Sequence, residues 1–236
     1  MNHISRLTNG CCGRALLALV TGCGQSDSFF PLSSGSVWRY RTKLTTGAGE
    51  TLGEQTISVD STDKVADKAV SIRRSSSGHL WAINESEQGI ARITARREID
   101  DEWQSDPEPY FVLKTPHKVG ITWQAKTAPY VLTRRAEFPP ELVHNHSTVM
   151  TYSIVALNEA VSVPAGEFSD CIKVEGTAAQ RLYVDPVAGF ADVPLTTLEW
   201  YCKGMGLVKL TRVEKVNSPF LFGGEFSMEL VASSRN

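Results

Sequence analysis

The stretch Trp38-Arg39-Tyr40-Arg41-Thr42-Lys43-Leu44 decides the fold class of this chain. Its even positions carry apolar or small side chains, and its odd positions carry three cations. Successive side chains of a strand point to opposite faces of a sheet, so this alternation is typical of a half-buried strand.

Short runs of the same kind fill the rest of the chain. They are rich in β-branched or aromatic residues and are bounded by Gly, Pro, Asn or Asp. After the N-terminal region, no segment of ten or more residues has helical periodicity, which argues against parallel βαβ units. We predict an all-β fold, a single curved antiparallel sheet or half-barrel, over residues 36–236. The expected strands are 55–60, 69–74, 80–84, 90–99, 110–114, 132–138, 149–157, 168–175, 180–184, 197–201, 207–216 and 226–231.

The first 23 residues predict export. Arg6 and Arg14 occur without any acid, an apolar run covers residues 15–20, and Thr21-Gly22-Cys23 follows. The sequence from Val20 to Cys23 resembles the bacterial lipobox. This predicts a lipoprotein signal peptide over residues 1–22, a lipidated Cys23 as the first mature residue, and a tether over 23–35. Six apolar residues are too few for a transmembrane helix, which needs about 20.

Charge and length narrow the class of protein further. Removing residues 1–22 leaves 22 basic and 26 acidic residues, a net charge of −4. This balance argues against a nucleic-acid partner, because such proteins concentrate cations to neutralise phosphates. The remaining 214 residues suit one β domain after the tether.

One pattern occurs twice. Pro31-x-x-x-Gly35-x-x-Trp38 and Pro116-x-x-x-Gly120-x-x-Trp123 each lead into an expected strand. Proline fixes φ and glycine permits a tight turn, so each pattern predicts a corner at which a tryptophan docks. We expect the two indoles to fill the core. The alternatives are a binding platform for the indoles and two β-meander halves for the repeat.

These motifs resemble those of a group of bacterial envelope lipoproteins of unknown biochemical role. The group has a PLxxGxxWxY opening (here Pro31–Tyr40), a mid-chain PLxxGxxW (116–123, with His117 in place of leucine), a VPAGxF element (163–168) and a closing YxPGxGLV (201–208, without the proline). The fold that this resemblance implies is similar to the half-barrels of lipoprotein-localisation carriers, whose concave face holds acyl chains. The shared residues belong to turns and core and imply no catalysis.

Other candidate sites are weaker. His144 and His146 share one face if extended and could bind zinc, but Pro139-Pro140 favours a solvated loop. The acidic segment 98–108 lacks the calcium-loop spacing, so we expect a charged hairpin. No nucleophile elbow or other catalytic arrangement occurs. We therefore expect no catalytic residues, no cofactor and no metal site.

Adjacent arginines occur in three of the expected strands: Arg73-Arg74, Arg96-Arg97 and Arg134-Arg135. Each pair directs one arginine to each face of the sheet. An inward arginine could meet a lipid head group, although we expect its long side chain to reach solvent.

Cys171 and Cys202 are the cysteines that remain after the anchor. Export to an oxidising compartment favours a disulfide between them. Strand parity argues against it, because Cys171 alternates with Lys173 and Glu175, whereas Cys202 alternates with apolar residues. We leave the Cys171–Cys202 bridge open.

Three functions remain. We favour a lipid-anchored protein of the bacterial envelope that acts by binding or assembly with other envelope proteins. The alternatives are a carrier of an acyl chain or other apolar ligand, and an envelope hydrolase, which has the least support. Gly24 follows the anchor cysteine, and we expect sorting to the outer membrane, facing the periplasm.

Overall fold

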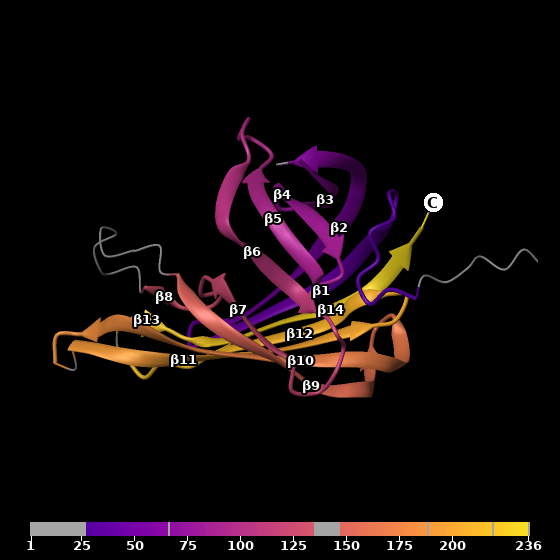
Figure 1. Ribbon diagram of the computed structural model, residues 1–236. Coiled ribbons are helices and arrows are strands. Elements are labelled where there is room, and N and C mark those ends of the chain that lie inside the picture. The colour runs from indigo at the N-terminus through magenta and orange to yellow at the C-terminus, as the bar shows by residue number, and fades with distance from the viewer. Residues whose placement is uncertain (1–26, 66, 135–146, 188, 219, 236) are drawn as a thin grey trace, which may run out of the picture.

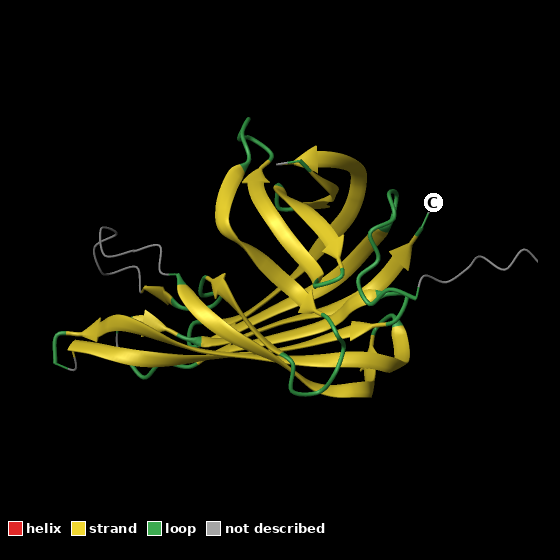
Figure 2. Cartoon of the chain, viewed as in Figure 1, coloured by secondary structure: helices red, strands yellow, loops and turns green. Residues whose placement is uncertain are grey.

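The computed structural model describes residues 27–65, 67–134, 147–187, 189–218 and 220–235. The expected signal peptide and Cys23 lie outside these ranges. The described residues form strands, turns and loops without a helix (Figure 2). This part of the chain therefore contains no helix that is long and apolar enough to cross a membrane. The strands are β1 (Val37–Thr46), β2 (Gly49–Val65), β3 (Lys68–Ser75), β4 (His79–Ser86), β5 (Gly89–Arg97), β6 (Gln104–Lys114), β7 (Thr122–Thr127), β8 (Thr133–Arg134), β9 (Thr148–Val163), β10 (Gly166–Asp185), β11 (Gly189–Cys202), β12 (Gly206–Glu214), β13 (Leu221–Phe222) and β14 (Gly224–Ser234).

Twelve of these strands form one antiparallel sheet in the order β6-β5-β4-β3-β2-β1-β14-β12-β11-β10-β9-β7. The remaining two, β8 and β13, pair with each other. The sheet curls on itself, so that β2–β6 stand above the orange and yellow strands of the second half (Figure 1). The result is a nearly closed β-barrel, which confirms the prediction of an all-β fold built on one curved antiparallel sheet.

The strand order divides into two meanders of six strands. The first runs from β1 to β6, and the second runs through β7, β9, β10, β11, β12 and β14. They join where β1 pairs with β14. At the other seam, the indole nitrogen of Trp123 in β7 donates a hydrogen bond to the carbonyl oxygen of Phe111 in β6, at 2.9 Å. One side chain thus bridges the edges that the sheet ladder leaves unpaired.

The repeated sequence pattern forms the same corner at the start of each meander. Gly35 and Gly120 both have positive φ, 82° and 90°, which glycine adopts without strain. The Gly35 amide donates to the Val59 carbonyl in β2, and the Gly120 amide donates to the Ile154 carbonyl in β9, both at 2.8 Å. Each partner strand returns a hydrogen bond from its own amide to the residue after the glycine. The two meanders are therefore alike in the corner that opens them.

Both corner tryptophans are buried, Trp38 to 2% exposure and Trp123 to 5%. The Trp38 indole nitrogen donates to the Met205 carbonyl at 2.8 Å. Neither tryptophan is among the residues that line the barrel cavity. Burial with a satisfied indole N–H is the arrangement of a packing residue, so the structure favours the core interpretation over the platform.

Cys171 and Cys202 form a disulfide between β10 and β11. They lie directly opposite each other in the register, as do Lys173 and Trp200. The parity argument against the bridge was wrong because it took the charged neighbours of Cys171 and the apolar neighbours of Cys202 to lie on opposite faces of the sheet. The Lys173 amine instead lies 5.1 Å from the centre of the Trp200 ring, so an apolar and a charged residue share one face of the sheet.

Candidate functional site

The barrel contains a cavity of about 710 Å³ that is open to solvent. Strands from both meanders supply its walls, together with the segment that precedes β1. Its lining is mostly aromatic and aliphatic: Phe30, Ile57, Trp81, Ile83, Tyr110, Val112, Tyr130, Tyr201, Leu207, Leu210, Phe226 and Met228. The polar lining residues are Gln55, Arg73, Ser77, His79, Arg92 and Glu199. An apolar pocket with a few polar groups is the usual form of a small-molecule site.

Strand alternation places these side chains. In β4, His79, Trp81 and Ile83 are two residues apart and all face the cavity, and Phe226 and Met228 do the same in β14. The residues between them point to the other face of the sheet. Alternation in the sequence therefore indicates which residues share a face, whereas curvature of the sheet decides which face encloses a cavity.

Arg73 in β3 is the most unusual lining residue. Its side chain is 8% exposed, and its guanidinium carbon lies 4.4 Å from the centre of the Phe30 ring and 4.9 Å from that of Trp38. Its Nε has no hydrogen-bond partner among the described residues. Burial lowers the pKa of Arg73, although the nearby phenols of Tyr40 and Tyr201 oppose this shift.

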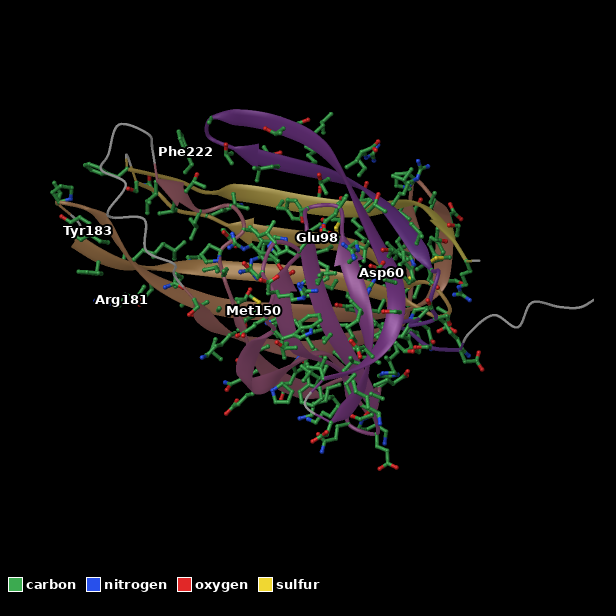
Figure 3. The ribbon with its side chains drawn as sticks, turned by 90° about the horizontal axis from the view of Figure 1, so that it is seen from above. Asp60, Glu98, Met150, Arg181, Tyr183 and Phe222 are labelled. Atoms are coloured by element: carbon green, nitrogen blue, oxygen red, sulfur yellow. A yellow bond between two sulfur atoms is a disulfide. The ribbon has the colours of Figure 1, made fainter. Side chains whose placement is uncertain are left out.

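Arg74, the next residue, points to the opposite face. Its guanidinium pairs with Asp60 at 2.5 Å and also with Glu98. Both acidic partners lie on the purple β2–β6 half in Figure 3. The prediction that adjacent arginines divide between the two faces is therefore correct here. The expectation that the inward arginine reaches solvent is wrong for Arg73, because the barrel closes over it.

A second arginine, Arg92, and Tyr110 form another part of the wall. The Arg92 guanidinium carbon lies 4.6 Å from the centre of the Tyr110 ring. The hydroxyl of Tyr110 lies 3.0 Å from that of Tyr152, which belongs to the other meander. Burial raises the pKa of both phenols, so both stay protonated as hydrogen-bonding groups. This contact reinforces the seam between β6 and β7.

Glu199 is the carboxyl group of the lining. It is 9% exposed and accepts hydrogen bonds from the hydroxyls of Tyr201, at 2.5 Å, and Thr197, at 3.4 Å. Burial raises the pKa of Glu199, while these hydrogen bonds and the charge of Arg212 act in the other direction. The carboxyl thus has protein partners on both oxygens.

We expect Glu199→Gln to change the pH dependence of stability. Because the folded pKa is raised, the folded protein retains a proton that the unfolded chain releases, so the wild type loses stability as pH rises from about 4.5 through the folded pKa. The glutamine variant should lack this loss and gain melting temperature relative to wild type as pH rises. Thermal unfolding at several pH values measures the difference.

Glu229→Gln is the matched control, with the opposite sign. Burial raises the pKa of Glu229, but Lys209 and Arg41, at 3.0 and 2.9 Å, lower it overall. Its contribution is present above a pH of about 4.5 and is lost as pH falls through its folded pKa. Parallel pH profiles for wild type and the Glu199 variant would contradict the assignment.

Arg212 and Glu214 form a buried ion pair in β12. Nε of Arg212 lies 2.8 Å from Oε1 of Glu214, and the side chains are 1% and 0% exposed. The Glu214 carboxylate also accepts hydrogen bonds from the backbone amides of Tyr130, Val131 and Leu132, at 2.9–3.1 Å. Both carboxylate oxygens of Glu214 therefore bind groups of the protein itself. We assign the ion pair a structural role: it holds the loop between β7 and β8 against the barrel.

The remaining sequence candidates lie away from the cavity or outside the described residues. Cys23, His144 and His146 lie outside the described residues. Residues 98–103 of the acidic segment form the β5–β6 connection, where Arg97 pairs with Asp100 at 3.2 Å, as expected for a charged hairpin, and residues 104–108 belong to β6. Within the described ranges, no three His, Cys, Asp or Glu residues gather where they could hold a metal ion.

Comparisons with known proteins find similarity to two solved structures of low sequence identity. No protein-family model and no curated protein matches the chain. A candidate lipoprotein from Parabacteroides distasonis is similar over 87% of this chain and 98% of its own, with 17% identity and a TM-score of 0.39. A candidate exported protein with a YmcC-like fold from Bacteroides fragilis is similar over 88% and 99%, with 13% identity and a TM-score of 0.41.

Proposed function

We propose that this protein is a lipid-anchored component of the bacterial envelope that binds an apolar ligand inside its barrel. The cavity of about 710 Å³ is the observation that carries the binding role, since small-molecule sites span roughly 300–1,000 Å³ and are mostly apolar. The protein acts by binding and not by catalysis. The ion pair and hydrogen bonds that commit the Glu199 and Glu214 carboxyl groups to protein partners support a binding role.

The location rests on the sequence. The lipobox-like segment ending at Cys23 supports a membrane anchor, and Gly24 supports sorting to the outer membrane, facing the periplasm. Phe30, seven residues after the anchor cysteine, already packs into the barrel, so the tether would hold the barrel close to the membrane surface.

Cys23→Ala should abolish lipid attachment, because only the thiol can accept the lipid. Metabolic labelling with a fatty-acid analogue should mark the wild type and leave the variant unmarked. Cys171→Ala together with Cys202→Ala is the control, since it removes the two disulfide-bonded cysteines but keeps the anchor. Equal labelling of wild type and the Cys23 variant would contradict the anchor.

The ligand-binding role is tested on the mature chain, residues 23–236, carrying Cys23→Ser so that no lipid is attached. Native mass spectrometry and solvent extraction after bacterial expression should detect a co-purifying apolar compound. A protein that is consistently empty and binds no fluorescent apolar probe would exclude the carrier role and favour assembly with other envelope proteins.

A further inference from the structure

We propose that the ligand is an amphiphile whose anionic head group binds Arg73 and whose single apolar tail lies along the aromatic and aliphatic wall of the cavity. This inference rests on the proposed function, because it names the chemical class of ligand for the same cavity.

Arg73 is a buried cation without an anion. It is 8% exposed, and it takes part in none of the ion pairs between described residues. The guanidinium has five N–H donors; it lies against the faces of the Phe30 and Trp38 rings and close to the Tyr40 phenol, and its Nε has no partner among the described residues. A buried charge without a partner is strongly unfavourable, so an anionic acceptor from outside would complete the site.

The other arginines show that this fold pairs its cations where their role is structural. Arg212 is more deeply buried, at 1% exposure, and Glu214 neutralises it at 2.8 Å. Arg74 adjoins Arg73 and has two acidic partners on the outside of the barrel. Arg73 alone combines burial, a place in the cavity wall and an Nε without a partner among the described residues.

The charge balance of the lining also favours an anion. Arg73 and Arg92 are its two arginines, and Glu199 is its one carboxyl group. The hydroxyls of Tyr201 and Thr197 already bind the Glu199 oxygens. A cationic ligand would therefore meet the Arg73 guanidinium and a carboxyl group that already has partners.

The size of the cavity indicates one chain. A methylene group is about as large as a water molecule, whose share of liquid volume is about 30 Å³, so a chain of about sixteen carbons needs roughly 500 Å³. The cavity of about 710 Å³ holds such a chain with its head group. The apolar lining, which includes Leu210, Phe226 and Met228, provides the wall for the tail.

The test compares cis-parinaric acid with its methyl ester, which has the same tail and no charge. Both are titrated by fluorescence into the mature chain carrying Cys23→Ser. We expect the acid to bind at least about tenfold more tightly than the ester, which is the contribution of a hydrogen bond to a charged group.

Arg73→Met should remove this preference and keep ester affinity, which also shows that the barrel is intact. Arg74→Met, on the outer face, should retain the preference, and Arg73→Lys should retain part of it.

The outcomes separate the two proposals. Equal affinity of the wild type for acid and ester would overturn the head-group inference and leave the apolar cavity in place. Binding of neither probe would overturn the proposed function itself. Displacement of the acid by inorganic phosphate at equal concentration would show that the tail contributes nothing, which would also contradict an amphiphile.

Discussion

Glu214→Ala should destabilise the barrel more than any other single substitution considered, by about 3–5 kcal/mol or more in the free energy of unfolding. The variant leaves Arg212 as a buried charge without its partner. It also removes the acceptor of three backbone amides, those of residues 130–132, and each unsatisfied buried donor costs about 1–3 kcal/mol. Domains of this kind are stable by only about 5–15 kcal/mol, so the variant should be marginally folded at 37 °C.

Urea denaturation measures this loss of stability, and two further variants serve as controls. Glu229→Ala breaks a more exposed pair with Lys209 and should cost less than about 1 kcal/mol. Replacing Arg212 and Glu214 together by apolar residues should recover part of the loss, because no buried charge then remains alone. A Glu214→Ala variant as stable as Glu229→Ala would show that the loop does not depend on this carboxylate.

The alternation of side chains in the sequence predicted the fold class, but the expected strands were shorter than those in the structure. Strand β10 runs unbroken from Gly166 to Asp185, whereas the sequence suggested two strands separated at Gly176. A Cβ at Gly176 would come within 2.7 Å of the side chains of Met150 and Thr197. This glycine is therefore required by packing inside the sheet, and composition alone cannot distinguish such a glycine from one that ends a strand.

The cavity was less predictable than the sheet. Local alternation identifies two faces for the Arg73-Arg74 pair, but the burial of Arg73 follows from closure of the barrel by residues far away in the sequence, among them Phe30 and Trp38. Glu199 and Glu214 each look like an exposed strand residue in isolation. Their burial depends on partners contributed by other strands and loops, such as the amide of Val131, 83 residues away from Glu214.

Of the sequence features, the repeated Pro-Gly-Trp pattern predicted the most about the tertiary structure. It marks the start of each meander, and its second copy places Trp123 at the seam where β7 meets β6. The Trp123 ring stacks on Tyr152 with centres 5.7 Å apart, and Tyr152 in turn contacts Tyr110 of β6 through their hydroxyls. In Figure 3, by contrast, Arg181 and Tyr183 lie at the far end of β10, away from this seam.

Trp123→Ala should therefore destabilise the protein by about 3–5 kcal/mol, the usual cost of truncating a buried aromatic side chain, and should open the barrel at one place. Hydrogen exchange should accelerate first in β6 and β7, because these strands are the two ends of the sheet and the variant loses the indole that bridges them. Trp123→Phe retains most of the packing and loses the hydrogen bond to Phe111, so it should cost only about 1–2 kcal/mol.

Trp38→Ala should be as destabilising as Trp123→Ala without this localised exchange, since β1 is paired on both sides. If Trp123→Ala leaves stability unchanged while the wild-type indole is open to a soluble quencher, Trp123 is not a packing residue, and the seam is held by the tyrosine pair alone.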